Sequence, residues 1–160
     1  MEWSIARLET EADAEACARL MASSEPWLTL GRTYEASLAI IRDSTREVFV
    51  LCDGTRKLSG FLILCLTGAF VGYIQTICID PDCRGQGLGT RLLAFAEERI
   101  LSQFPNVFMC VSSFNHDARR LYERLGYRVV GELSDYIVAG HSEILLRKTL
   151  GPLARLPDRK

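Results

Sequence analysis

A glycine-rich loop at residues 84–90 contains the residues with the clearest chemical potential. It reads Arg84, Gly85, Gln86, Gly87, Leu88, Gly89 and Thr90. Glycine leaves backbone N–H groups uncovered, and an amphipathic stretch that starts at Leu88 predicts a helix directly behind the loop. The N-terminus of a helix adds unsatisfied N–H groups and the positive end of the helix dipole. With the guanidinium of Arg84 in front, the loop predicts a binding site for phosphate groups.

The spacing of these residues narrows the kind of phosphate ligand. A Walker loop needs Gly-Lys-Ser/Thr, and this loop has no lysine; a dinucleotide fingerprint needs Gly-x-Gly-x-x-Gly, and these glycines alternate. The loop instead resembles the Arg/Gln-x-x-Gly-x-Gly/Ala loop that holds the coenzyme A pyrophosphate in the GNAT superfamily of acetyltransferases. The resemblance implies that residues 86–90 face the pyrophosphate, with Arg84 and Gly85 ahead of them. The alternative is a loop that only turns a strand into a helix.

A second stretch, residues 115–127, resembles the GNAT signature Asn-x-x-Ala-x-x-Leu-Tyr-x-x-x-Gly-Phe/Tyr at every fixed position. The matching residues are Asn115, Ala118, Leu121, Tyr122, Gly126 and Tyr127. This resemblance implies acetyl-CoA as the cofactor, with the Tyr122 hydroxyl near the thioester sulfur as a proton donor. It also implies that Asn115 caps the following helix and contacts the pantetheine arm, and that backbone groups of Ile77 and Ile79 pair with this arm. The alternative for Tyr122 is a core aromatic residue.

The general base stays open at this stage. An amine must be neutral to attack, and the ordinary pKa values of amines lie above neutral pH. By the resemblance, Tyr73 and Cys110 stand where relatives carry glutamates, and neither is a convincing base. We therefore expect a water molecule oriented by Gln75 or by a loop carboxylate. The carboxylate candidates are Glu25, Glu35 and Asp135.

Two segments, residues 25–34 and 134–142, are expected to form the acceptor site. The candidate acceptor residues are Glu25, Trp27, Tyr34, Tyr73, Gln75 and Tyr136. Aromatic side chains could wall a cleft there, and acidic groups could attract a cationic amine; Trp27 could equally anchor its loop on the core. The second segment and the strand after it are similar to the end of ribosomal-protein alanine N-acetyltransferases, which favours a peptide amine.

These observations predict an enzyme, an acetyl-CoA-dependent N-acetyltransferase. The expected reaction moves acetyl to a primary amine by direct attack, on a peptide α-amine, a lysine or a small amine. One alternative is an acetyltransferase dedicated to small amines such as polyamines or antibiotics. Another, from a different class, is a non-catalytic sensor or partner module that binds acyl-CoA. The expected partners are therefore acetyl-CoA and an amine acceptor.

Composition limits the other function classes. The net charge of −1 over 160 residues disfavours a nucleic-acid partner, and no apolar run approaches the ~20 residues of a membrane span. The six cysteines contain no Cys-x-x-Cys pair and the two histidines are far apart, so no metal site is expected. Free thiols and the absence of a signal-peptide pattern at the N-terminus predict a cytoplasmic protein. We expect a monomer or a homodimer.

The hydrophobic pattern predicts the elements that position the two motifs. Strands are expected at 3–8, 46–52, 58–66, 70–79, 107–112, 127–132 and 143–150, and helices after Thr10, after Thr33, at 88–103 and at 115–125. The order is similar to that of the GNAT fold. The expected fold class is therefore α/β (mixed α+β), with a mixed central sheet of six to seven strands flanked by about four helices. Residues 1–150 are expected to form one acetyltransferase domain, followed by a short tail at 151–160.

Overall fold

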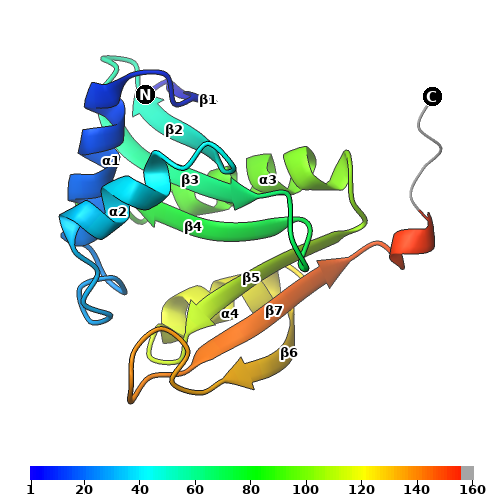
Figure 1. Cartoon of the computed structure of the whole chain (residues 1–160). Coiled ribbons are helices and arrows are strands. Elements are labelled where there is room, and N and C mark those ends of the chain that lie inside the picture. The colour runs from blue at the N-terminus through cyan, green and yellow to red at the C-terminus, as the bar shows by residue number, and fades with distance from the viewer. Residues whose placement is uncertain (156–160) are drawn as a thin grey trace.

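Seven strands form one mixed sheet in the computed structural model, which describes residues 1–155 (Figure 1). They are β1 (Trp3–Arg7), β2 (Glu47–Asp53), β3 (Leu58–Cys65), β4 (Tyr73–Ile79), β5 (Asn106–Ser112), β6 (Arg128–Leu133) and β7 (Glu143–Thr149). Their order across the sheet is β1-β2-β3-β4-β5-β7-β6. Neighbouring strands pair antiparallel except β4 and β5, which are parallel.

Four α-helices cover the two faces of this sheet (Figure 1). They are α1 (Glu11–Ala22), α2 (Tyr34–Ile41), α3 (Leu88–Leu101) and α4 (His116–Arg124). Two short 3-10 helices lie between β4 and α3 (Pro81–Cys83) and after β7 (Leu153–Arg155). The Thr10 hydroxyl accepts from Asp13 N at 3.1 Å, and the Thr33 hydroxyl accepts from Ala36 N at 3.1 Å. Both helices therefore begin directly after these threonines, as predicted, and each threonine is the N-cap of its helix.

Alternate residues of the central strands supply two separate hydrophobic cores. Val48 and Val50 of β2 pack in the core that contains α1 and α2, whereas Phe49 and Leu51 pack in the core that contains α3. Since β2 and β3 are buried on both faces, their sequences are almost continuously apolar. This double burial makes the middle of the sheet the rigid base for the site.

The parallel seam between β4 and β5 is short. Only Tyr73–Phe108 and Ile74–Met109 pair across it. Immediately after this seam the register of β4 against β3 passes from Leu64–Ile74 to Ile63–Thr76, so that Gln75 is an extra residue in β4. Such a bulge bends a strand and increases its twist. The two strands therefore diverge beyond Ile74, and the sheet opens there (Figure 1).

The predicted fold class and element order are confirmed, with seven strands and four α-helices. The largest difference lies at β4, which begins at Tyr73 and not at residue 70, because residues 68–72 bend with Gly68 and Gly72 at φ of +100° and +89°. The division into a domain and a tail stays a prediction. Residues 156–160 of that tail, including Pro157, lie outside the described residues.

Gly72→Ala is expected to destabilise the protein at the β4–β5 seam. A Cβ at Gly72 would lie 2.4 Å from the backbone oxygen of Asn106, whereas a Cβ at Gly68 would meet nothing within 4 Å. The free energy of unfolding should fall by about 1–2 kcal/mol in both alanine variants, because both positions have a left-handed backbone. Only Gly72→Ala should lose a further ~1–3 kcal/mol through overpacking. Equal free energies of unfolding for the two variants in urea would contradict this expectation.

Candidate active site

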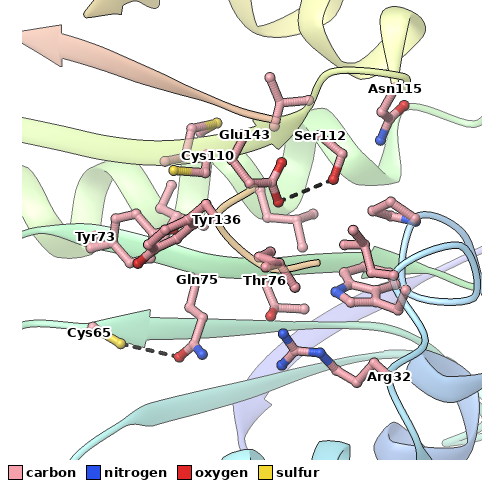
Figure 2. Close-up of a pocket in the computed structure, with 18 of the residues that line it drawn as sticks. Arg32, Cys65, Tyr73, Gln75, Thr76, Cys110, Ser112, Asn115, Tyr136 and Glu143 are labelled. Atoms are coloured by element: carbon pink, nitrogen blue, oxygen red, sulfur yellow. Dashed lines mark hydrogen bonds between the residues drawn. The ribbon is translucent and has the colours of Figure 1, made fainter. Parts of the chain in front are cut away.

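Two cavities lie in the opening between β4 and β5. The larger one, which we call the inner cavity, has a volume of about 560 Å³ and is shown in Figure 2. The second, which we call the glycine-loop groove, has a volume of about 410 Å³. Five residues line both: Pro26, Trp27, Ile77, Asn115 and Tyr122. The two cavities therefore meet at these residues.

The glycine loop adopts a backbone geometry that favours glycine. Gly85 and Gly87 have φ of +74° and +77°, and Gly87 is the N-cap of α3 with no side chain bonded to the first-turn N–H groups. The buried Leu88 fixes the loop to the core. The predicted loop residues that line the groove are Arg84, Gly85, Gly87, Leu88, Gly89 and Thr90; Gln86 is exposed and does not. The uncovered N–H groups suit a pyrophosphate.

The edge of β4 beyond Ile74 has no neighbouring strand on the β5 side within residues 1–155. Ile77 and Ile79, which were predicted to pair with a pantetheine arm, both line the groove beside this edge. Arg84 donates from Nε to the Ile79 oxygen at 3.3 Å and so ties the loop to the strand. An extended ligand in the groove could therefore pair with β4 as an added strand.

Tyr122 lies on α4, whose C-terminal turn fixes the position of this residue. Tyr127 N donates to Tyr122 O at 3.0 Å and Gly126 N donates to Glu123 O at 3.2 Å, with Gly126 at φ +97°. The rings of Tyr122 and Tyr127 pack edge to face with their centroids 6.2 Å apart. Burial raises the pKa of Tyr122 to about 12, so its hydroxyl stays protonated at neutral pH. In the described residues this hydroxyl has no hydrogen-bond partner and can donate to a ligand.

Asn115 occupies the N-cap position of α4, but the prediction that its side chain caps the helix is wrong. Its backbone has φ −90° and ψ 68°, whereas the two capping threonines, Thr10 and Thr33, are extended. That backbone leaves the amide without a capping hydrogen bond. The side chain lines both cavities instead, where it can contact a ligand.

Glu143, for which the sequence pattern predicts only the first position of a strand, lies in the wall of the inner cavity (Figure 2). Its side chain is buried, Oε1 accepts from the Ser112 hydroxyl at 3.1 Å, and Oε2 has no partner among the described residues. Burial raises the pKa of Glu143 above its ordinary value, although Ser112 and the charge of Arg32 act in the opposite direction. The sequence feature that could have identified Glu143 as a cavity residue is its position as a charged residue directly before the apolar run 144–146.

The two β4 residues proposed for the acceptor site, Tyr73 and Gln75, both line the inner cavity. The carbonyl oxygen of Gln75 accepts from Arg46 Nε at 2.6 Å and from Cys65 Sγ at 3.3 Å, so its partners are already within the protein. Burial and the neighbouring Cys110 raise the pKa of Tyr73. Burial also raises the pKa of the Cys110 thiol. Neither group is therefore a base at neutral pH.

The other residues predicted for the acceptor site differ in whether they line the inner cavity, the glycine-loop groove or neither. Trp27 lines both cavities and also packs on the core beside α1 and α2, and Tyr136 lines the inner cavity. Glu25 lines the glycine-loop groove and not the inner cavity. Tyr34 packs against the α1–α2 core and lines neither cavity. The loop carboxylates Glu35 and Asp135 also lie outside both cavity walls.

All six cysteines are free thiols. Within the described residues, no group of three or more histidine, cysteine or acidic side chains is placed to hold a metal ion. The helices found between residues 1 and 155 are too short or too polar to cross a bilayer.

Comparison with known proteins identifies the family. The acetyltransferase (GNAT) family model matches residues 6–127. A blasticidin-S acetyltransferase of Streptomyces morookaense is 32% identical over 90 residues, which cover 52% of this chain and 66% of the relative. An S-(2-succino)cysteine N-acetyltransferase of Bacillus subtilis is 28% identical over 90% of this chain and 94% of its own length. The chain therefore belongs to the GNAT family of acetyltransferases.

A solved structure supports the same fold. The crystal structure of an aminoglycoside 6′-N-acetyltransferase in complex with coenzyme A has a TM-score of 0.73 and 16% identity, over 97% of this chain and 99% of the neighbour. The predicted superfamily is confirmed by the family model, and this structure confirms the fold. The alignments to the curated relatives matched first span about two thirds of their length, 66% and 64%.

Glu143→Gln is expected to change how stability depends on pH. The pKa of Glu143 is higher in the folded than in the unfolded chain. The wild-type protein therefore loses free energy of unfolding as pH rises through the folded-state pKa and this carboxyl ionises. Glutamine keeps an acceptor for Ser112 and cannot ionise. The melting temperature of the variant minus that of the wild type should therefore be larger at pH 7.5 than at pH 4. Glu132→Gln, at an exposed glutamate of β6, controls for the loss of one charge. A difference that falls as pH rises would contradict this.

Proposed function

We propose that this protein transfers acetyl from acetyl-CoA to a primary amine held in the inner cavity, by direct attack. The observation that carries the proposal is the meeting of the two cavities at Tyr122. A cofactor in the glycine-loop groove and an acceptor in the inner cavity would have their reacting ends at the same place. Holding two reactants in contact supplies much of the rate enhancement in such reactions.

The glycine-loop groove fits the cofactor. Gly85, Gly87 and the first turn of α3 offer uncovered N–H groups for the pyrophosphate, and Arg84 adds a permanent positive charge. The open edge of β4 offers backbone partners for the pantetheine arm. When bound, acetyl-CoA supplies the activated thioester; the coenzyme A complex of the aminoglycoside acetyltransferase supports this assignment.

Glu143 and Tyr122 provide the two proton transfers that the reaction needs. Glu143 is the only carboxylate in the wall of the inner cavity among residues 1–155, and its Oε2 is unpartnered. It takes a proton from the ammonium, directly or through one water. The amine nitrogen then bonds to the acetyl carbon as the carbon–sulfur bond breaks. The Tyr122 hydroxyl protonates the leaving sulfur and regains the second proton lost by the nitrogen.

The names of the relatives support a small-molecule acceptor over a peptide. Blasticidin S and S-(2-succino)cysteine are both small molecules. A site without a base carboxylate would favour the non-catalytic alternative, whereas Glu143 places a buried carboxylate in the wall of the inner cavity. We further propose action in the cytoplasm, supported by the free cysteines, as a monomer or homodimer without a nucleic-acid or membrane partner.

The direct test is turnover of acetyl-CoA with an amine panel, followed through the free thiol that is released. The panel contains free amino acids, peptides with a free α-amine, peptides with lysine, polyamines and aminoglycosides. We expect turnover with at least one class. Binding of coenzyme A without turnover of any class would favour the sensor role.

Gly87→Ala should weaken coenzyme A binding with the fold retained. No atom outside the loop lies within 4 Å of a Cβ at Gly87, but its φ of +77° strains any other residue. A shifted loop would misplace the N–H groups, and we expect affinity to fall about tenfold or more, ~1.4 kcal/mol. Gly68→Ala, at a positive φ and in neither cavity wall, is the control. Wild-type affinity of Gly87→Ala in calorimetry would remove the loop from the cofactor site.

Tyr122→Phe should fold normally and react slowly. The substitution keeps the ring against Tyr127 and removes a hydroxyl that has no partner in the described chain. Loss of the proton donor should lower the single-turnover rate about 10²-fold, with little change in KM for acetyl-CoA. Tyr127→Phe is the matched control, because Tyr127 bonds to Glu97 at 2.9 Å and lines neither cavity. An unaltered single-turnover rate in Tyr122→Phe would mean that another group protonates the sulfur.

A further inference from the structure

The inner cavity is not an acidic pocket. Its charged lining residues are one carboxylate, Glu143, and two guanidinium groups, Arg32 and Arg46. Arg46 is already engaged, since its Nε donates to Gln75 at 2.6 Å and its guanidinium pairs with Asp43. Arg32 is therefore the positive group of the cavity that is left for a ligand.

Arg32 is held in place by its own segment. It directly precedes Thr33, the N-cap of α2, and its backbone N donates to the Trp27 oxygen at 3.0 Å. Leu30, two residues before Arg32, is buried and anchors the turn between Trp27 and Arg32. The guanidinium is half-buried and makes no hydrogen bond or ion pair with any described residue. Burial lowers the pKa of Arg32, which reflects the cost of holding this charge away from water.

Arg32 and Glu143 lie on opposite sides of the inner cavity (Figure 2). No ion pair joins them in the described structure, although each favours the charged form of the other. Thr76 lies between them, and its buried hydroxyl oxygen has no hydrogen-bond partner there. Unpaired buried charges and polar atoms cost stability unless a ligand satisfies them. The cavity therefore offers the Glu143 carboxylate to a cation, the Arg32 guanidinium to an anion and the Thr76 hydroxyl between them.

Resting on the proposed function, we infer that the acceptor is a small zwitterion, an amino acid or a close analogue that carries a primary amine and an anionic group. The amine lies at Glu143, which takes its proton, and the carboxylate or similar anion lies at Arg32. The planar fork of arginine matches the two oxygens of a carboxylate. Arg32 is thus a specificity-determining residue, and Glu143 serves both recognition and proton transfer.

The same charges disfavour the other acceptor classes. A polyamine or an aminoglycoside carries several positive charges, and one of them would meet the guanidinium of Arg32, which no carboxylate pairs with in the described structure. A peptide with a free α-amine has an amide in place of the nearby carboxylate and would leave Arg32 without a partner. Leaving the half-buried guanidinium of Arg32 without a partner costs free energy, and this cost discriminates against such acceptors.

The test compares matched acceptors on the full-length protein. For each side chain, kcat/KM is measured for the free amino acid, its C-terminal amide and the amine without the carboxylate. We expect at least one free amino acid to exceed its own amide by about tenfold or more, because a charged hydrogen bond is lost with the anion. Melting temperature in the presence of coenzyme A gives a second readout, in which that amino acid stabilises the protein more than its amide.

Variants of Arg32 assign the preference to this residue. Arg32→Gln should lower kcat/KM for the preferred amino acid by about 10²-fold, leave the amide nearly unchanged and abolish the stabilisation by the amino acid. Arg32→Glu should reverse the charge preference in favour of diamines. Arg42→Gln is the matched control, because Arg42 is exposed, pairs with Glu11 and lines neither cavity. The ratio of kcat/KM for the amino acid to that for its amide should be the same in this variant as in the wild type.

The outcomes separate this inference from the proposed function. Turnover of amides, peptides or polyamines at least as efficient as that of every free amino acid would overturn the zwitterion assignment and leave the acetyltransferase activity standing. A preference for amino acids that survives in Arg32→Gln would overturn the role of Arg32. Coenzyme A binding without turnover of any amine would overturn the proposed function, and the inference with it.

Discussion

The divergence of β4 from β5 is the constraint on which the site depends. A regular parallel sheet pairs every backbone group and leaves no room for a ligand between its strands. Here one extra residue, Gln75, bends β4 just after the last paired residues, Ile74 and Met109. The bend frees a strand edge for the glycine-loop groove and opens the inner cavity beside it. Arg46 and Cys65 both bond to the Gln75 side chain, so the bulge is fixed in place.

Backbone geometry positions the groups beside this opening more than side-chain hydrogen bonds do. Tyr122 is located by the turn at Gly126 and by the ring of Tyr127, while its hydroxyl remains unbonded in the described chain. Arg32 is likewise located by a turn and by the helix that follows it. Functional groups held in this way keep their hydrogen-bonding capacity for ligands. This arrangement agrees with preorganisation, in which the cost of ordering is met during folding and not during the reaction.

The element order and the backbone of the glycine loop could be predicted from the sequence because their signals are local. The left-handed backbone at residues 85 and 87 favours glycine. The side chains of Thr10 and Thr33 each accept a hydrogen bond from the backbone N–H three residues later and so start their helices. Glu143 could not be found in this way. Its burial depends on the pairing of β7 with β5, which brings it against Ser112, 31 residues earlier in the chain. The bend at residue 75 is equally non-local, since it exists only in the register of β4 against β3.

A ligand bound along the open edge of β4 would also make the stability of the fold depend on the concentration of that ligand. Backbone groups at Ile77 and Ile79 adopt their alignment only in the folded chain, so a ligand that pairs with them binds the native state and not the unfolded one. By mass action, a free ligand concentration of 100 times its dissociation constant adds about 2.7 kcal/mol to the free energy of unfolding. That amount corresponds to about a hundredfold smaller unfolded population. The lifetime of such a protein in a cell, where proteases sample the unfolded fraction, would then follow the supply of the acyl donor as well as the sequence of the chain.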